Sequence, residues 1–361
     1  MRSLIDIQDL SVSELDALFA TASDIVARPE AYAEACRHKK LATLFFEPST
    51  RTRLSFEAAM LELGGSVIGF SDADSSSASK GESLADTARV ISAYADITAI
   101  RHPKEGAALV AASSATIPVI NAGDGGHAHP TQTLTDLFTI LRDHGRIEGL
   151  TVGFCGDLKY GRTVHSLIAA LSRYAGIKVV LISPNELTLP DYVREGVLEA
   201  NGMPYLETTD LEGSLADLDV LYMTRIQRER FPDPDEYARL KDSYVLTPEK
   251  LVVAKETLSI LHPLPRVNEI SVRVDADPRA RYFEQAENGK YVRMALILKL
   301  LAEAADRVPT KIPGEEMPDV ECKNPVCITT CEQELLPRFR AATREGTAVR
   351  CVFCEKLGVR R

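Results

Sequence analysis

The sequence predicts an α/β protein of two domains, each a parallel sheet with crossover helices, followed by a small C-terminal four-cysteine module. The chain has 361 residues, which is too long for one typical domain of roughly 100–200 residues. Apolar, β-branched runs alternate with segments of helical period, and this order is typical of strand–helix–strand units. The runs are apolar at consecutive positions, as in parallel strands that are covered on both faces.

The expected elements follow one another in that alternating order. Strands are expected at residues 41–46, 66–70, 96–101, 116–120, 150–155, 177–183 and 218–223. The clearest helices are expected at 53–63, 81–95, 133–142 and 162–174, with a long apolar helix at 292–305. Ligands of open parallel sheets bind beyond the carboxyl ends of the strands. Motifs directly after the strands are therefore the first candidates for a site.

Composition excludes several classes of protein. Hydrophobic residues make up 45% of the chain and charged residues 26%, which are ordinary globular values and exclude disorder as the main state. No apolar run approaches the roughly 18 residues of a membrane span, and acidic residues interrupt the apolar N-terminus, unlike a signal peptide. The net charge of −10 does not suit a general polyanion binder. We expect a cytoplasmic protein that binds any anionic ligand through local arginines.

The cysteines concentrate in the last 40 residues, which favours metal binding over disulfides. Cys322 and Cys327 form one pair, Cys351 and Cys354 form a second, and 23 residues separate the pairs. This spacing suits one structural Zn²⁺ held by four thiolates. Cys331 is an extra thiol that is either a bystander or a replacement for Cys327. The alternative is a set of unrelated buried thiols.

Small four-cysteine modules often bind nucleic acid, so that function is a second hypothesis for residues 308–361. This segment has 9 basic and 8 acidic residues, a net charge of +1 before the thiolates are counted. Binding to a phosphate backbone depends on clustered Lys and Arg, and metal thiolates make the segment more negative. We therefore expect no nucleic-acid partner. Residues 308–318 are rich in Pro, Lys and Glu and are expected to form a linker.

A candidate anion site follows the first expected strand. Residues 48–53, Pro-Ser-Thr-Arg-Thr-Arg, precede a helix, and Ser49 or Thr50 would cap its N-terminus. The first turn of a helix presents N–H groups and the positive end of the dipole, and Arg51 adds a fork suited to a phosphate. The alternative is an ordinary capped helix. The segment lacks the glycine and lysine pattern of a Walker A loop.

The longer string at residues 45–57, FFEPSTRTRLSFE, resembles the carbamoyl-phosphate motif of transcarbamoylases. Further strings match in the same order, at residues 79–87, 101–108, 121–140, 156–167, 221–230 and 261–270. Together they resemble the catalytic chains of the aspartate carbamoyltransferase family over residues 1–306. The transcarbamoylase fold then implies the following parts: a carbamoyl-phosphate-binding domain at 1–132 with a returning helix at 290–306, an aspartate-binding domain at 133–289, a linker at 307–320 and a zinc-binding module at 321–361.

The resemblance implies transfer of the carbamoyl group of carbamoyl phosphate to the α-amino group of L-aspartate, giving N-carbamoyl-L-aspartate and phosphate in pyrimidine biosynthesis. No redox or organic cofactor is needed, because such a site works by positioning and fixed charges. The family's catalytic residues match Arg51, Thr52, Lys80, Arg101 and His129. Its carbamoyl-phosphate ligands match Ser49, Thr50, Arg51, Thr52, Ser76, Arg101, His129, Gln132 and Leu264. Its aspartate ligands match Lys80, Arg162, Arg225, Gln227 and Leu264.

The implied roles suit the chemistry of the matched residues. A neutral His129 would donate a hydrogen bond to the carbamoyl oxygen. The nearby His127 matches no residue of the family's site, so we assign it no role there. Arginines such as Arg225 meet carboxylates bidentately. The alternative for Arg101 is a surface arginine that pairs with Glu105.

Ser76 and Lys80 match a loop that enters the neighbouring subunit's site in the family. The resemblance therefore implies a homotrimer with shared active sites, and the sequence leaves open whether trimers pair. The loop is one residue shorter than the family pattern, so Ser75 or Ser77 could take the place of Ser76. The match of Lys80 to the family pattern is fixed by Gly81 and Glu82, which follow it directly.

Ornithine carbamoyltransferase is the alternative among transcarbamoylases, since it shares the phosphate motif. It typically carries an HCLP loop and an SMG motif, whereas this chain has HPLP at 262–265 and no SMG. Arg225 and Gln227 suit a carboxylate side chain, and the arginine would repel an ornithine ammonium. Aspartate is therefore the expected acceptor.

The cysteine tail resembles the zinc-binding region of the regulatory chain of bacterial aspartate carbamoyltransferases. That chain carries a larger nucleotide-binding domain ahead of its zinc module, for which residues 308–361 leave no room. We expect a fused structural module that packs on a catalytic domain or bridges subunits, and no nucleotide inhibition of this chain by itself.

Overall fold

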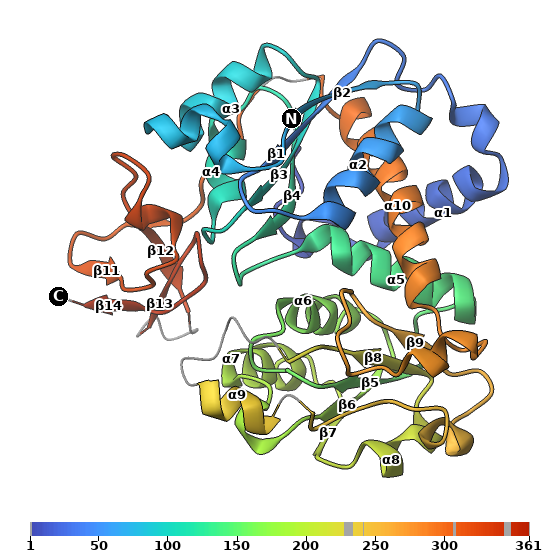
Figure 1. Cartoon of the computed structure of the whole chain (residues 1–361). Coiled ribbons are helices and arrows are strands. Elements are labelled where there is room, and N and C mark those ends of the chain that lie inside the picture. Colours follow the sequence, from blue (N-terminus) through green and yellow to red (C-terminus); the bar gives the residue numbers. More distant parts are fainter. Residues whose placement is uncertain (1, 227–233, 241, 306–307, 343–347, 361) are drawn as a thin grey trace. The chain divides into compact units, whose positions relative to one another are not determined.

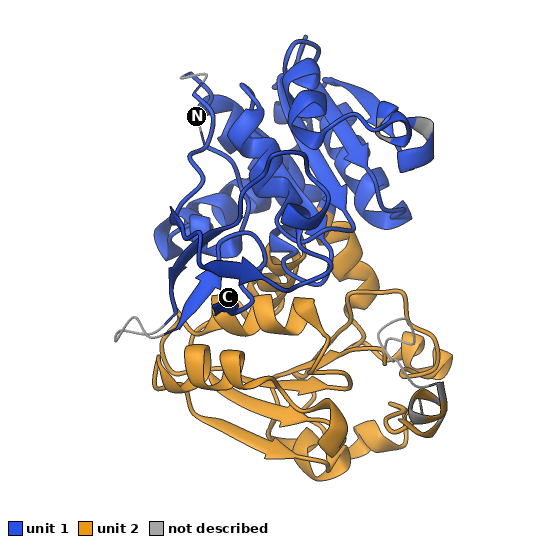
Figure 2. Ribbon diagram, turned by 90° about the vertical axis from the view of Figure 1, so that its left-hand side faces the viewer, with its two compact units in different colours: residues 1–131, 290–361 blue, residues 132–289 orange. Residues whose placement is uncertain are grey.

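The computed structural model describes residues 2–226, 234–240, 242–305, 308–342 and 348–360 (Figure 1). The chain divides into two compact units, Met1–Thr131 with Lys290–Arg361 and Gln132–Gly289 (Figure 2). Each unit contains its own parallel sheet, and the predicted α/β architecture is confirmed. None of the helices in the described ranges combines the length and the hydropathy that a membrane span requires.

The sheet of the first unit has the strand order β2-β1-β3-β4, and all its strands are parallel. The strands are β1 (Lys40–Phe45), β2 (Ser66–Phe70), β3 (Ile97–His102) and β4 (Val119–Asp124). The N-terminal segment extends the β4 edge, since Leu4 forms a parallel bridge with Ile120. Every residue of β4 is buried as a result.

Helices cover both faces of this sheet (Figure 1). One face carries α3 (Leu84–Ser92) and α4 (Ala107–Ser114). The other carries α1 (Val12–Ala27), α2 (Thr50–Glu62) and the C-terminal half of α10 (Tyr282–Ala302). This layering explains why the strands are apolar on both sides.

The chain returns to the first unit in the middle of α10, at Lys290. Arg293 joins this helix to α2, because its Nη1 donates to Ser55 Oγ at 3.1 Å and its guanidinium lies 5.1 Å from the centre of the Phe56 ring. The helix begins at Tyr282 rather than at residue 292, since its first turns are polar and lack the apolar signal of the later ones.

The sheet of the second unit has the order β7-β6-β5-β8-β9, again all parallel. Its strands are β5 (Thr151–Cys155), β6 (Lys178–Ile182), β7 (Tyr205–Thr208), β8 (Val220–Met223) and β9 (Ser259–Leu261). Its helices are α5 (Pro130–His144, of which the first two residues belong to the first unit), α6 (Arg162–Leu171), α7 (Asp191–Val193), α8 (Leu211–Ser214) and α9 (Pro234–Leu240).

The described residues 308–342 and 348–360 form the C-terminal module, which belongs to the first unit and includes the segment expected to be a linker, since Glu315–Glu316 form a strand there. Its strands are short and antiparallel, in sheets ordered β10-β12-β13 and β11-β14. They are β10 (Glu315–Glu316), β11 (Val320–Cys322), β12 (Arg338–Ala341), β13 (Val349–Cys351) and β14 (Gly358–Arg360).

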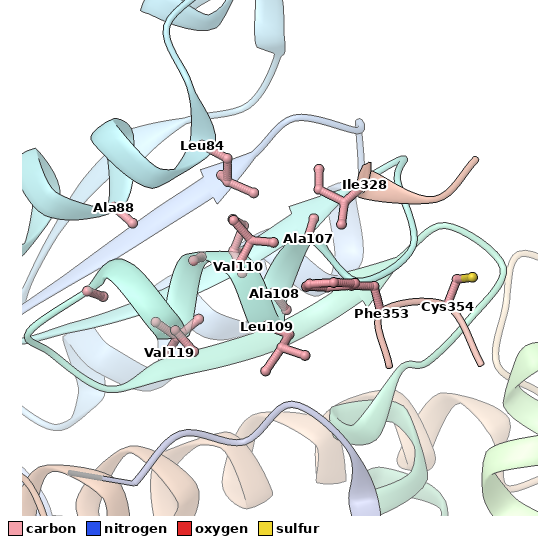
Figure 3. Close-up of a cluster of buried hydrophobic side chains, with 14 of the residues drawn as sticks. Leu84, Ala88, Ala107, Ala108, Leu109, Val110, Val119, Ile328, Phe353 and Cys354 are labelled. Atoms are coloured by element: carbon pink, nitrogen blue, oxygen red, sulfur yellow. The ribbon is translucent and has the colours of Figure 1, made fainter. Parts of the chain in front are cut away.

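The module and the first unit share one buried apolar cluster, in which Ile328 and Phe353 lie beside the first turn of α4 (Figure 3). Gly106, the N-cap of α4 with a φ of 88°, permits this approach, because a Cβ there would lie 2.5 Å from the Cβ of Phe353. Main-chain hydrogen bonds also join the two parts. The N–H of Glu105 donates to the carbonyl of Val326 at 2.8 Å, and the N–H of Ile328 donates to the carbonyl of Glu105 at 2.9 Å.

Some element limits differ from the predicted ones for identifiable reasons. The strand expected at 116–120 begins at Val119, because Pro118 lacks an N–H for the ladder, and it continues through buried polar residues to Asp124. The short strands β7 and β9 and the helices α1 and α4 were not among the predicted elements. A strand of three or four residues, such as β9 or the half-exposed β7, carries too few positions for a pattern.

Candidate active site and metal centre

The residues predicted to bind phosphate stand at the N-terminus of α2, directly after β1. Ser49 is the N-cap residue, but its side chain makes no capping hydrogen bond, so the predicted hydroxyl cap is absent. Thr50 and Arg51 are exposed in the first turn, and Thr52 is half-buried. The turn therefore combines the positive end of the helix dipole with hydroxyl and guanidinium donors that an anion could share.

Arg101 lies at the same edge of the sheet, because the parallel register pairs Phe45 of β1 with Arg101 of β3. Its guanidinium forms an ion pair with Glu47 Oε2 at 3.0 Å, so the alternative of a surface arginine paired with Glu105 is wrong. Burial lowers the pKa of Arg101, although the charge of Glu47 opposes this shift. The buried Nε of Arg101 has no hydrogen-bond partner among the described residues. A buried N–H donor at a strand end fits a ligand oxygen.

His129 follows β4 and is buried, with its Nδ1 3.4 Å from Thr131 Oγ1. The adjacent His127 has a different role, because its Nδ1 contacts Asp124 Oδ2 at 3.0 Å. Burial disfavours the charged ring, yet Asp124 raises the pKa of His127 to about 10. Asp124 also accepts from the main-chain N–H groups of Gly106 and Ala128 at 2.8 and 3.0 Å. This ion pair fixes the loop that carries His129.

Ser76 and Lys80 stand apart from this group, in the segment that follows the edge strand β2. The segment contains two short 3₁₀ turns, Ala73–Ser75 and Ser77–Lys80. Ser76 Oγ donates to the carbonyl of Ala73 at 2.7 Å, within its own loop, and Lys80 is exposed. The structure therefore brings Ser49–Thr52, Arg101 and His129 together at the carboxyl ends of the strands of the first sheet. It leaves Lys80 exposed on the loop that follows β2.

In the second unit, Gln132 is oriented by a buried carboxylate. Its Nε2 donates to Asp136 Oδ1 at 2.7 Å, so its carbonyl oxygen remains as the acceptor of the amide. Gln285 Nε2 donates to the same oxygen at 2.6 Å, and the Tyr222 hydroxyl donates to Asp136 Oδ2 at 3.0 Å. This orientation leaves the amide oxygen of Gln132 as the acceptor that its predicted role requires, and the role itself stays a prediction.

The predicted aspartate ligands follow adjacent strands of the second sheet. Arg162 is the first residue of α6, after β5, and Arg225 follows β8, which pairs with β5. Both side chains are half-buried. Gln227 lies outside the described residues.

Leu264 lies beyond β9, the next strand along, and has a φ of 53°, in the left-handed region that β-carbon-bearing residues seldom adopt. The peptide bond between Leu264 and Pro265 is cis. The N–H of Leu264 donates to His262 Nδ1 at 2.7 Å, and His262 Nε2 contacts Glu269 Oε1 at 2.7 Å. Burial opposes ionisation of Glu269, but the His262 contact and main-chain donors hold its pKa below the usual value. These buried side chains fix the backbone of the Leu264 loop.

The C-terminal module contains a compact thiol cluster. Cys322, Cys327, Cys351 and Cys354 are buried, and their Sγ atoms all lie within 4.8 Å of one another. The Sγ atoms of Cys322 and Cys354 are 3.6 Å apart, and those of Cys327 and Cys351 are 3.9 Å apart. A tetrahedral metal with bonds of about 2.3 Å to sulfur requires separations of about 3.8 Å. The four thiols therefore fit one metal ion, and the exposed Cys331 is outside the cluster.

Sequence reasoning missed several carboxylates of the sites. Glu47 and Glu269 both lie within strings that carried the resemblance, at 45–57 and 261–270, so their positions were available as a signal. Asp136 lies within a third such string, at 121–140, one helical turn after Gln132.

The two parallel α/β units, with basic side chains after their strands, define a transcarbamoylase fold with an added metal-binding module. The chain belongs to the aspartate/ornithine carbamoyltransferase family: residues 2–142 match its carbamoyl-phosphate-binding domain and residues 148–300 its Asp/Orn-binding domain. Residues 315–359 match the metal-binding domain of the aspartate carbamoyltransferase regulatory chain. The predicted resemblance is confirmed for both parts of the chain.

Similar proteins are found among curated sequences and solved structures. The aspartate carbamoyltransferase catalytic subunit of Lachnoclostridium phytofermentans is 64% identical over 301 residues, which cover 83% of this chain and 98% of that protein. The catalytic subunit from Clostridium acetobutylicum is 61% identical over 300 residues, with the same coverage. The M. jannaschii catalytic subunit structure has a TM-score of 0.79 at 49% identity and covers 84% of this chain and 99% of that chain. Aspartate transcarbamoylase of Trypanosoma cruzi, solved with carbamoyl phosphate, has a TM-score of 0.78 at 39% identity and covers 83% and 96%.

Proposed function

We propose that the chain transfers the carbamoyl group of carbamoyl phosphate to the α-amino group of L-aspartate, giving N-carbamoyl-L-aspartate and phosphate, a step of pyrimidine biosynthesis. The observation that supports this most directly is the group of donors at the ends of β1, β3 and β4. This group consists of the N-terminus of α2, the buried Nε of Arg101, and the buried side chain of His129. The names of relatives at 64% and 61% identity agree with this activity.

In the proposed reaction, the donors stabilise negative charge on the phosphate group and on the carbamoyl oxygen. Ser49, Thr50, Arg51 and Thr52 would bind the phosphate group, and Arg101 and His129 would polarise the carbamoyl oxygen. The aspartate nitrogen forms a C–N bond to the carbamoyl carbon, and the C–O bond to phosphate breaks. The phosphate leaves with the electron pair of that bond and takes up the proton that the nitrogen loses. Fixed donors stabilise the oxyanion that forms at the carbamoyl oxygen, without reorganisation during the reaction.

The remaining site residues are proposed for binding and orientation. Gln132 would accept from the carbamoyl amide, and the backbone of Leu264 would contact both substrates. Arg162, Arg225 and Gln227 would bind the carboxylates of aspartate, and Ser76 and Lys80 would act from their loop. We assign carbamoyl-phosphate binding to the domain 1–132 and aspartate binding to the domain 133–289.

We further propose that the metal is Zn²⁺ and that its role is structural. Four thiolates are a closed ligand set that leaves no open position for substrate. The assembly is proposed to be a homotrimer with shared active sites, which the exposure of Lys80 supports. A cytoplasmic location agrees with a thiolate metal site, because thiols stay reduced there.

The proposal is tested with the purified chain and ¹⁴C-labelled carbamoyl phosphate, with aspartate or ornithine as acceptor. We expect labelled carbamoyl aspartate with aspartate and no product with ornithine. A preference for ornithine, or no product with either acceptor, would refute it. Native mass and metal content measured on the same sample test the trimer and the zinc assignment separately.

A further inference from the structure

Glu332, which lies outside every motif discussed above, joins the C-terminal module to the start of α3. Its carboxylate oxygens accept hydrogen bonds from the main-chain N–H groups of Leu84 and Ala85, at 3.2 and 3.1 Å. These residues open α3, and the N-cap Ser83 accepts from the N–H of Asp86 at 3.0 Å. The first N–H groups of a helix have no partner within it, and a carboxylate also suits the positive end of the dipole. Glu332 therefore completes the cap of a helix that is far away in sequence.

Glu332 lies five residues after Cys327, one of the four cysteines of the thiol cluster. Its own N–H donates to the carbonyl of Ile328 at 3.0 Å, which closes a turn that begins next to Cys327. Thr329 Oγ1 donates to Cys327 Sγ at 3.2 Å within the same turn. The ligand Cys327 and the capping carboxylate therefore belong to one hydrogen-bonded segment.

On the other side of the contact, α3 follows the loop that carries Lys80. The 3₁₀ turn Ser77–Lys80 is separated from the N-cap Ser83 by Gly81 and Glu82 only. Glu82 is also tied to α3, since the Thr87 hydroxyl donates to its Oε1 at 2.7 Å. A first turn that stays formed fixes the C-terminal end of the loop, whereas a frayed first turn would allow the loop end to move.

We propose that Glu332 is a positioning residue for Lys80: the module caps α3 and thereby holds the loop from which Lys80 acts on the substrates. The role of Lys80 rests on the proposed function. The contact between Glu332 and the start of α3 is independent of that function. The fused module thus contributes to turnover through two hydrogen bonds to the catalytic part of the chain.

The test compares Glu332→Gln with Glu334→Gln in the metal-loaded, full-length enzyme. Both variants make the same chemical change, and Glu334 is exposed two residues further along. We expect Glu332→Gln to lower kcat/KM for aspartate roughly five-fold, the effect of one weakened helix cap, and Glu334→Gln to leave it unchanged. Hydrogen exchange of the peptide that contains residues 81–88 should become faster only in Glu332→Gln, with equal metal content in both.

A double-mutant cycle separates positioning from a general structural effect. In a Lys80→Ala background, assayed at higher enzyme concentration, Glu332→Gln should lower kcat/KM no further, because the loop contribution is already lost. Wild-type kinetics in Glu332→Gln, or a full additional loss in the Lys80→Ala background, would overturn the proposal. A wild-type chain without carbamoyltransferase activity would instead refute the proposed function, while the exchange measurement would still report on the cap.

Discussion

Replacing Gly106 with alanine should loosen the C-terminal module from α4 and speed the loss of its metal. An added Cβ would lie 2.5 Å from the Cβ, 2.6 Å from the carbonyl oxygen and 2.8 Å from the Cα of Phe353. None of these atoms is the flexible end of a side chain, so the segment 351–354 must shift. That segment begins and ends with the ligands Cys351 and Cys354.

The free-energy cost of Gly106→Ala has two parts, the backbone strain and the clash with Phe353. Alanine at a left-handed φ costs about 1–2 kcal/mol, and overpacking against a fixed neighbour costs about 1–3 kcal/mol more. Gly145 has a φ of 67° with no atom within 4 Å of its built Cβ, and it lies in the other unit, so Gly145→Ala is a control that should release metal at the wild-type rate. The clash by itself should make metal release about 5- to 150-fold faster in Gly106→Ala, if it acts fully on release.

The assay is the rate at which a chelating zinc indicator takes metal from each loaded variant. Unfolding midpoints are less suitable, because a chain with several units need not unfold in one step. Equal release rates in Gly106→Ala and Gly145→Ala would show that Phe353 does not pack against residue 106, and the packing argument would be refuted.

Three further outcomes are expected. Arg225→Ala should lower kcat/KM for aspartate about 10- to 100-fold, the effect of a lost charged hydrogen bond, and leave carbamoyl-phosphate affinity unchanged; a parallel loss of both would contradict the assigned role. The raised pKa of His127 implies that its ion pair with Asp124 stabilises the fold fully below the ordinary value of 6.5 and loses this effect as the pH rises to about 10. The difference in local opening free energy between wild type and His127→Gln, measured by hydrogen exchange of the peptide that contains residues 124–129, should therefore shrink from pH 6 to pH 10, and a constant difference would refute this. Cys327→Ser should abolish stoichiometric zinc in elemental analysis, whereas Cys331→Ser should retain it; the reverse result would reassign the ligands.

Local patterns predicted the parallel strands well, because burial on both faces leaves uninterrupted apolar runs such as 150–155 and 177–183. The same reasoning failed at β4, where the polar residues up to Asp124 are buried and satisfied by hydrogen bonds that no local pattern reveals. The α2 site was predicted from its place after a strand. The Glu47 partner of Arg101 was not, because a pairing across strands depends on the register of β1 and β3.

Contacts between distant segments were the least predictable part. The two cysteine pairs predicted the metal cluster, since four thiols at that spacing have few alternatives, but spacing could not choose between Cys327 and Cys331. The packing of the module against α4 depends on Gly106, which cannot be told from an ordinary loop glycine in the sequence. Glu332 is likewise an ordinary surface acid until its two N–H partners, 248 and 247 residues away, are known.

The covalent continuity between α10 and the module has a consequence for assembly. A module on the same polypeptide packs on α4 in a unimolecular step, at an effective concentration on the order of millimolar for a short connection. The Glu105 and Phe353 contacts therefore do not depend on protein concentration, and dilution to assay conditions leaves them intact. Every catalytic unit carries one module, so a population with unequal numbers of the two, which separate chains would allow, never arises.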